Sequence, residues 1–256
     1  MIVIAHLSDV HIGATPESAG RCDAVMRYLD ALPGDLDAVL VTGDIADHAL
    51  PAEYEAAAKL LTSRHPILIG PGNHDRRPEF RQFLLGEAPS EESTDESTGR
   101  PVNQVLRTGR AVYAMCDSSI PGRDDGHLDD ETLDWLEGVL DGADLPVFVA
   151  FHHPPVTLQS PPIDAIRLHE TGRLERLLAG RAGVPAVLVG HSHMAAVTTF
   201  AGRPLLVGGG VVSTLKLPWE GAVSFDTGIS YDQPPMVAFH VLDDEGRLTT
   251  HYRVVQ

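Results

Sequence analysis

The feature that most constrains the fold is an alternation of short apolar segments with amphipathic ones over the first 190 residues. Between the apolar segments, apolar residues recur at helical spacing in residues 22–32, 52–62, 131–140 and 172–178. Buried strands that alternate with helices are typical of α/β domains with a largely parallel sheet. The sequence therefore predicts an α/β fold. The expected strands are residues 2–6, 38–42, 66–69, 111–116, 146–151 and 185–189.

The pattern changes near Ala195. Apolar segments at residues 204–207, 236–242 and 248–255 are separated by turns and not by helical stretches. This arrangement indicates antiparallel strands that belong to a second sheet packed on the first. We expect a single domain over residues 1–256, in which residues 195–256 complete the second sheet.

Composition and charge exclude several classes of protein. The 19 Lys and Arg residues against 36 Asp and Glu residues give a net charge of −17, so long nucleic acid is not an expected partner. No segment has the roughly 18 continuous apolar residues of a membrane helix, and the apolar start is expected to be a strand, not a signal peptide. Cys22 and Cys116 are too few for a disulfide framework, which favours a cytoplasmic location.

One acidic segment interrupts the pattern at residues 87–99. It contains almost no apolar residues, so it cannot contribute to a core and is expected to be a flexible insertion. A lid over a functional site is the alternative, because the segment follows a motif at residues 72–75.

Side chains that can bind metals follow five of the predicted strands at the point where each strand ends. Ligand sites of open α/β sheets lie at this edge, and residues i and i+2 of an extended chain point to the same side. Burying so many ionisable groups without partners is costly, whereas metal ions turn carboxylates and neutral imidazoles into ligands. The motifs are Ser8-Asp9-Val10-His11, Thr42-Gly43-Asp44, Gly70-Pro71-Gly72-Asn73-His74-Asp75, His152-His153-Pro154-Pro155 and Gly190-His191-Ser192-His193.

Taken in this order, the motifs resemble those of the calcineurin-like metallophosphoesterases, and they span residues 9–193. The stretch from His6 to His11 and the His152-His153-Pro154-Pro155 motif are similar to class III cyclic nucleotide phosphodiesterases. That branch includes relatives that hydrolyse glycerophosphodiesters. The resemblance implies two facing mixed β-sheets flanked by helices, a four-layer αββα sandwich, and a binuclear metal centre.

The resemblance also implies seven ligands in two sets that share Asp44 as a bridge. The choice of His152 over His153 follows the family spacing. Oxygen and nitrogen ligands without thiolates suit Mn, Fe, Zn or Co, so the expected cofactor is a pair of divalent or mixed-valence transition-metal ions. The two sets are Asp9, His11, Asp44 and His193 for one ion, and Asp44, Asn73, His152 and His191 for the other.

The expected reaction is hydrolysis of a small soluble phosphodiester, above all a 3′,5′-cyclic nucleotide. Two such ions can share a water and generate a hydroxide, which would attack phosphorus in line. His74 would aid departure of the leaving group, so the expected catalytic residues are His74, Asp44 and Asn73. The alternatives are a phosphomonoesterase, or a glycerophosphodiester or nucleotide-pyrophosphate hydrolase of the same fold. A non-catalytic metal-binding scaffold is the alternative from a different class.

The remaining expectations concern residues near these motifs and the oligomeric state. Arg76 and Arg77 either contact a substrate phosphate or simply begin a helix. His153 either contacts substrate or supports a ligand, and Asp75 is expected to orient a neighbouring histidine. Trp219 is expected to anchor a loop, with stacking on a base as the alternative. The apolar strands after residue 200 are a candidate homodimer contact.

Overall fold

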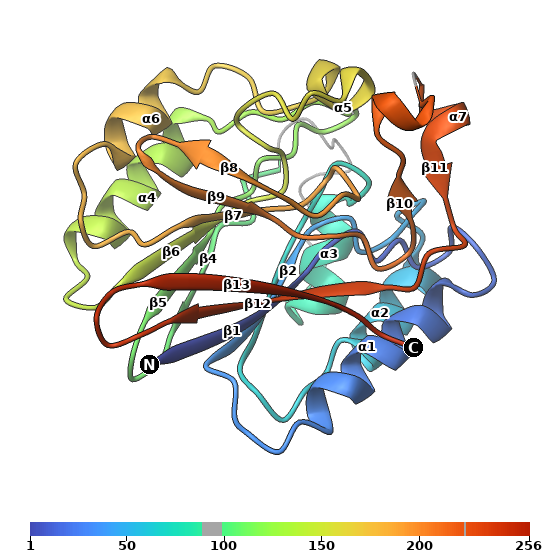
Figure 1. Cartoon of the computed structure of the whole chain (residues 1–256), viewed down its shortest axis with the longest axis horizontal. Coiled ribbons are helices and arrows are strands. Elements are labelled where there is room, and N and C mark those ends of the chain that lie inside the picture. The colour runs from blue at the N-terminus through green and yellow to red at the C-terminus, as the bar shows by residue number, and fades with distance from the viewer. Residues whose placement is uncertain (89–98, 223) are drawn as a thin grey trace.

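The computed structural model describes residues 1–88, 99–222 and 224–256. Figure 1 shows two β-sheets packed together with helices on their outer sides, which confirms the predicted fold class. The acidic segment predicted at residues 87–99 lies almost entirely outside the described residues, which exclude 89–98. None of the helices in the described ranges is long and apolar enough to cross a membrane.

The first sheet has the strand order β13-β12-β1-β2-β3. Its three parallel strands are connected by α1 and α2, and α3 follows the last of them. β12 returns from the end of the chain to pair antiparallel with β1, and β13 pairs with β12 at the edge. The elements are β1 (Ile2–Leu7), α1 (Ser18–Asp30), β2 (Ala38–Thr42), α2 (Pro51–Leu60), β3 (Ile67–Gly70), α3 (Arg77–Leu84), β12 (Met236–Leu242) and β13 (Leu248–Val254).

The second sheet has the strand order β4-β5-β6-β7-β9-β8. Its four central strands are parallel, whereas β4 and β8 pair antiparallel at the two edges. The elements are β4 (Gln104–Arg107), β5 (Val112–Met115), α4 (Asp130–Asp141), β6 (Val147–Ala150), α5 (Pro161–Ala165), α6 (Gly172–Leu178), β7 (Val187–Val189), β8 (Ala196–Phe200) and β9 (Arg203–Val207).

The C-terminal part divides between the two sheets. β8 and β9 extend the second sheet, but β12 and β13 extend the first. The expectation that residues 195–256 complete the second sheet is therefore correct only as far as β9. The physical reason is that the apolar alternation of a strand does not specify which sheet edge it pairs with, and the edge of β1 was open for β12.

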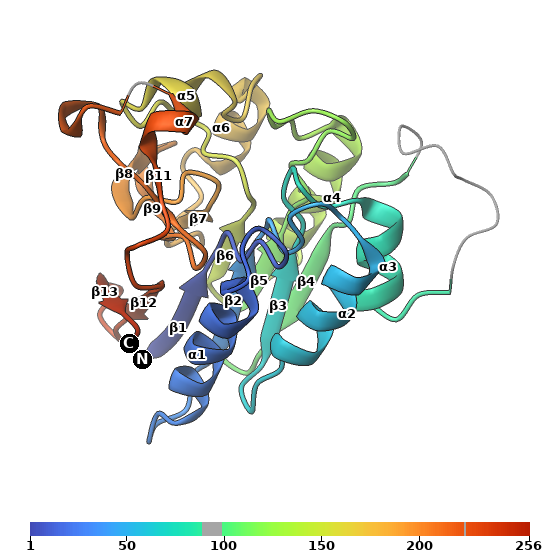
Figure 2. The same cartoon turned by 90° about the vertical axis from the view of Figure 1, so that its right-hand side faces the viewer.

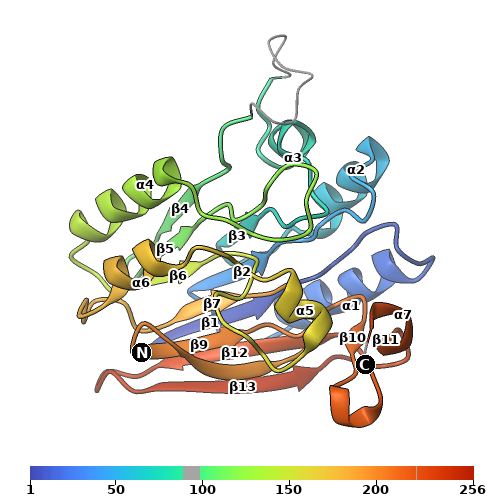
Figure 3. The same cartoon turned by 90° about the horizontal axis from the view of Figure 1, so that it is seen from above.

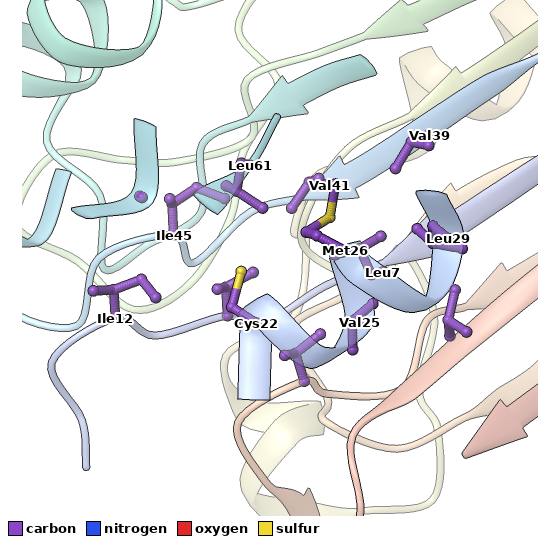
Figure 4. Close-up of a cluster of buried hydrophobic side chains, with 14 of the residues drawn as sticks. Leu7, Ile12, Cys22, Val25, Met26, Leu29, Val39, Val41, Ile45 and Leu61 are labelled. Atoms are coloured by element: carbon purple, nitrogen blue, oxygen red, sulfur yellow. The ribbon is translucent and has the colours of Figure 1, made fainter. Parts of the chain in front are cut away.

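Apolar side chains fill the spaces between the layers. Leu40 of the first sheet and Tyr113 and Phe148 of the second belong to one buried cluster between the sheets. Figure 4 shows a second cluster, in which residues of α1 such as Met26 and Leu29 face strand residues of the first sheet. α4 and α6 cover the second sheet in the same way. Burial of both sheet faces fixes the strand ends relative to one another.

A short two-stranded unit separates β9 from β12, and we call residues 214–231 the excursion. It comprises β10 (Thr214–Leu215), the 3-10 helix η2 (Pro218–Glu220), α7 (Phe225–Gly228) and β11 (Ile229–Ser230). β10 and β11 pair antiparallel with each other and not with either main sheet. Figures 2 and 3 show α7 of the excursion next to α5.

Candidate metal centre

All seven expected ligands lie just beyond the carboxyl ends of parallel strands. Because the two sheets face each other, the ends of their strands bring these residues into one site between the layers. The first sheet supplies Asp9 and His11 after β1, Asp44 after β2 and Asn73 after β3, and the second supplies His152 after β6 and both His191 and His193 after β7.

Five of these residues have left-handed backbone conformations. The φ angles are 56° for Asp9, 42° for His11, 52° for Asp44, 68° for His191 and 55° for His193. Positive φ is uncommon for residues other than glycine and is concentrated at functional sites, where the surrounding structure maintains it. The chain therefore turns sharply after β1, β2 and β7, and these turns direct the side chains into the site.

Asp44 lies at the centre of the cluster. Its Oδ2 atom is 3.3 Å from Nε2 of His11 and 3.2 Å from Nε2 of His152. Its Oδ1 atom accepts a hydrogen bond of 3.0 Å from the backbone N–H of His74. One carboxylate therefore connects a histidine of the first sheet with a histidine of the second.

The hydrogen bond made by Nδ1 of His11 and of His152 determines whether Nε2 of the same ring presents a lone pair or a proton to Asp44. Nδ1 of His11 donates to Oδ1 of Asp47 at 2.8 Å, and Nδ1 of His152 donates to the backbone oxygen of Thr42 at 2.6 Å. In a neutral ring, Nε2 then carries a lone pair. Both lone pairs face the Asp44 carboxylate, which is also an acceptor. A cation between these atoms would replace repulsion with coordination.

Several buried polar atoms lack a hydrogen-bond partner within the part of the chain that the structure describes. They include both carboxylate oxygens of Asp9, Nε2 of His11 and Nε2 of His191. Oδ1 of Asp9 is 3.6 Å from Nε2 of His193. Buried polar groups in native proteins are normally paired, and metal coordination would supply the missing partner here. The donor set therefore fits metal ions.

The atoms divide into overlapping groups. Asp9, His11 and His193 offer ligand atoms within 4.8 Å of one another, and so do Asp9, Asp44 and His152. Nε2 of His152 is also 3.2 Å from Oδ1 of Asn73 and 3.2 Å from Nδ1 of His191. The structure thus brings together every expected ligand of both sets.

The pKa values in the metal-free protein reflect the position of the Asp44 carboxylate between His11 and His152. Burial disfavours the charged form of His11, but its hydrogen bond and charge interaction with Asp44 raise the pKa to about 10. Burial likewise disfavours charged His152, yet Asp44 raises its pKa to about 9. Burial lowers the pKa of His193 to about 4, so that ring stays neutral. Without metal, protons on His11 and His152 take the place of the cations.

His153 is engaged elsewhere, although it lies near His152 and His191. Its Nδ1 atom is 2.8 Å from the Ser118 hydroxyl, and its Nε2 atom donates to the backbone oxygen of Asp124 at 3.2 Å. Burial lowers its pKa to about 3. Both partners of His153 lie outside the expected ligand set, whereas Nε2 of His152 faces Asp44 and Asn73. The geometry therefore favours His152 as the ligand and His153 as a supporting residue.

His74 is not one of the seven expected ligands, but one of its ring nitrogens lies within 4.8 Å of ligand atoms of His11 and Asp44. Its Nδ1 atom donates to the backbone oxygen of Asp47 at 2.8 Å, and its ring is 4.5 Å from the His11 ring, centre to centre. Its side chain is 40% exposed. Asp47 therefore contacts both His11 and His74, yet it was not predicted as a site residue. The available signal was a carboxylate three residues after Asp44.

Asp75 was predicted to orient a histidine, and this prediction is wrong. Its carboxylate accepts hydrogen bonds from the backbone N–H groups of Ile45, Ala46 and Gly72 and from the Tyr54 hydroxyl. Burial raises its pKa to about 6. Asp75 joins the loops after β2 and β3, and so it fixes the backbone on both sides of Asp44.

The two arginines after Asp75 have different environments. Arg77 donates to Asp117 at 2.8 Å, to the backbone oxygen of Gly99 at 2.6 Å and to that of Ser119 at 2.9 Å, so it is a structural residue. Arg76 is exposed and lines a small cavity of about 200 Å³ together with Asn73 and His74.

A larger cavity of about 390 Å³ opens onto the metal centre. One side is formed by residues of the cluster, including Asp44, Asn73 and His74. The lining also includes apolar residues, among them Phe225 and Tyr231 of the excursion. Trp219, also on the excursion, is 73% exposed, so the expectation that it anchors a loop is wrong.

Comparisons with known proteins agree with this arrangement. The family model described as calcineurin-like phosphoesterase matches residues 2–195. A probable cyclic nucleotide phosphodiesterase of Rhodococcus erythropolis is 34% identical over 233 residues, which cover 85% of this chain and 73% of the relative. The glycerophosphodiester phosphodiesterase GpdQ of Enterobacter lignolyticus is 32% identical over 209 residues, which cover 78% of this chain and 73% of the relative.

The fold is also similar to that of solved structures. A dimetal phosphatase from Danio rerio superposes with a TM-score of 0.64 over 100% of this chain and 99% of the other. The two sequences are 15% identical, so this similarity concerns the fold alone.

Proposed function

Because the chain belongs to the calcineurin-like phosphoesterase family, in which it is a metal-dependent phosphoric ester hydrolase, we propose that it hydrolyses 3′,5′-cyclic nucleotides at a binuclear metal centre. The observation that carries this proposal is the position of Asp44, whose Oδ2 atom faces Nε2 of His11 at 3.3 Å and of His152 at 3.2 Å. A carboxylate between two imidazoles from different sheets suits a bridging ligand.

Each side chain has a defined task in this proposal. Asp9, His11 and His193 hold one ion with Asp44, whereas Asn73, His152 and His191 hold the other with Asp44. When bound, the ions neutralise phosphoryl oxygens and lower the pKa of the attacking water. The protein residues keep these donors in a buried space that limits access of bulk water.

His74 is the proposed proton donor to the leaving oxygen. The backbone oxygen of Asp47 fixes its Nδ1–H, so the opposite nitrogen, Nε2, is available on an exposed ring beside the cavity. A protonated Nε2 can donate to an alkoxide as it departs, which is the task of a general acid. Arg76, at the neighbouring cavity, is the proposed cationic contact for a phosphate oxygen.

The relatives favour diester over monoester substrates. The Rhodococcus erythropolis relative is named a probable cyclic nucleotide phosphodiesterase and the Enterobacter lignolyticus relative a glycerophosphodiester phosphodiesterase. Glycerophosphodiester hydrolysis is therefore the second candidate. Phosphomonoester and nucleotide-pyrophosphate hydrolysis are further alternatives of the same chemistry.

A substrate panel tests the proposal. Protein supplied with Mn²⁺ is assayed on 3′,5′-cyclic AMP, 2′,3′-cyclic AMP, glycerophosphoethanolamine and p-nitrophenyl phosphate, with Asp44→Asn as the matched inactive control. We expect the highest kcat/KM on 3′,5′-cyclic AMP. A preference for glycerophosphoethanolamine would support the second candidate, and a preference for the monoester would overturn the diesterase proposal. Absence of hydrolysis throughout would favour a scaffold.

Three further points are proposals. We propose Mn, Fe, Zn or Co as the metals, because the donors are oxygen and nitrogen, and elemental analysis can identify them.

We propose a cytoplasmic location, which is consistent with two free, buried cysteines. We propose a homodimer through strands after residue 200, where Val254 is exposed on the edge strand β13; light scattering measures its mass.

A further inference from the structure

The proposed function leaves open what binds the organic part of the substrate, and the structure contains a surface for it. Resting on that proposed function, we infer that Phe225 and Tyr231 of the excursion form an aromatic wall for the non-reacting organic group of a monoanionic phosphodiester. We infer further that Arg21 positions this wall. The substrate class is thus a diester with a flat, uncharged group such as a nucleobase.

The geometry of the cavity supports the aromatic wall. The cavity of about 390 Å³ has the size of a site for a small molecule, for which roughly 300–1,000 Å³ is typical. Its lining combines residues of the cluster with Phe225, Ile229 and Tyr231. All three side chains are partly exposed, although apolar groups of this size are usually covered. A flat ring in the cavity would cover aromatic surface while the phosphate reaches the metal centre.

The charges of the cavity define the substrate further. Among the described residues that line it there is no lysine or arginine, and it includes the carboxylates of Asp44, Asp47 and Asp124. The proposed metal ions on Asp44 would hold the reacting phosphate, so a second phosphate or another anionic group would meet Asp47 and Asp124 without a compensating lysine or arginine. This arrangement favours a diester with a single negative charge over a nucleotide pyrophosphate.

Arg21 connects the wall to α1. Its Nε–H donates to the backbone oxygen of Val211 at 2.9 Å, one terminal nitrogen donates to the backbone oxygen of Tyr231 at 3.3 Å, and the other donates to that of Gln233. Val211 precedes the excursion and Gln233 follows it, so one guanidinium holds both ends. The planar geometry of arginine suits three fixed acceptors, and lysine cannot reproduce it.

The experiment uses two diesters with the same leaving group. Bis(p-nitrophenyl) phosphate retains an aryl group after cleavage, whereas methyl p-nitrophenyl phosphate retains a methyl group. The double variant Phe225→Ala/Tyr231→Ala is expected to lower the ratio of the two kcat/KM values about tenfold, mainly through KM of the aryl diester, because stacking is lost. Trp219→Ala removes an exposed aromatic residue outside the cavity and is the matched control, with an unchanged ratio.

Arg21 is tested by the same ratio. Arg21→Ala is expected to lower it about threefold to fivefold with little change in kcat, and Arg21→Lys is expected to restore only part of the loss. An unchanged ratio in Phe225→Ala/Tyr231→Ala, whether both kcat/KM values fall equally or neither falls, would overturn this inference. The proposed function would stand. Absence of hydrolysis of both diesters by the Mn²⁺-supplied natural sequence would instead overturn the proposed function, and this inference with it.

Discussion

Individual residues in the candidate metal centre are oriented by contacts that the motifs do not reveal. His11, His152 and His193 each use Nδ1 for a protein partner, namely the Asp47 carboxylate, the Thr42 carbonyl and the Ser213 hydroxyl. Such partners fix the tautomer and the ring orientation of a ligand histidine. The candidate ligands could be proposed from short motifs, because spacing identifies donor types at strand ends. Ser213 was not, because it contacts His193 only through tertiary folding.

Replacing Asp47 tests the value of such a partner. Asp47→Ala removes the acceptor for His11, so we expect metal affinity to fall about 10- to 100-fold. Asp47→Asn keeps an amide oxygen at the same place and should lose less. Titration calorimetry with Mn²⁺ measures both variants. Equal affinity in Asp47→Ala and the natural sequence would show that His11 does not need this contact.

Replacing His74 separates chemistry from metal binding. His74→Ala should keep both metals, since His74 lies outside both ligand sets, but lose about 10²–10⁴-fold in kcat on diesters with poor leaving groups. The loss should be smaller on p-nitrophenyl diesters, whose leaving oxygen needs little protonation. Metal content and kcat are measured on the same samples. A kcat on 3′,5′-cyclic AMP equal to that of the natural sequence would exclude His74 as the acid.

Strands and helices were easier to predict than the pairing between them. Segments such as β2 and β6 are almost entirely apolar because both faces are buried, and this signal is strong in the sequence. β10 and β11 have two residues each, too few to show an alternation, and they were not predicted. The pairing of β12 with β1 joins residues more than 200 positions apart, and no local pattern encodes it.

The pairing of β1 with β12 buries two histidines that the site does not use. Nδ1 of His6 is 3.1 Å from Nε2 of His240, and hydrogen-bond partners Thr42 and Thr250 lie at the two ends of the pair. Burial lowers the pKa of His6 to about 3, and burial together with His6 lowers the pKa of His240. Both rings therefore stay neutral in the folded protein when histidines of the unfolded chain become charged.

This pair should make stability depend on pH. The folded pKa values lie below the ordinary value of 6.5, so the stabilisation is complete above pH 6.5 and is lost as the pH falls. Each such histidine contributes a slope of about 1.4 kcal/mol per pH unit to the free energy of unfolding. His240→Gln should reduce the slope between about pH 6 and 4.5 by roughly that amount.

Urea unfolding of metal-free protein at several pH values measures the slope. His251→Gln, on the exposed face of β13, leaves the buried pair intact and is the control. An unchanged slope in His240→Gln, or an equal change in both variants, would contradict the explanation.

At the scale of the whole molecule, the candidate metal centre lies where the two sheets meet. Four of the expected ligands follow strands of the first sheet and three follow strands of the second, so ions bound here would hold the two halves of the core together. In their absence the Asp44 carboxylate faces two imidazoles, and the Asp9 carboxylate has no hydrogen-bond partner among the described residues. Metal binding should therefore increase the stability of the entire fold, and not only that of the site.

The size of this effect follows from linkage. A ligand at 100 times its Kd that binds only the folded state adds about 2.7 kcal/mol to the free energy of unfolding. For a chain of this length, that corresponds to a rise in Tm of about 5–10 °C. We expect this rise when Mn²⁺ is added to chelator-treated protein, measured by differential scanning calorimetry.

Asp44→Asn distinguishes the proposed cause from a general salt effect. The variant loses the shared ligand, so Mn²⁺ should raise its Tm by less than half as much. In the metal-free protein the Asp44 carboxylate pairs with protonated His11 and His152, and an amide cannot replace this charge interaction, so the metal-free variant should melt below the metal-free natural sequence. The difference in Tm between the two proteins should become larger when Mn²⁺ is added. Equal Mn²⁺ shifts in both would mean that the stabilising ions bind elsewhere. A Tm of metal-free Asp44→Asn equal to or above that of the metal-free natural sequence would mean that the contacts of the carboxylate with protonated His11 and His152 do not stabilise the fold.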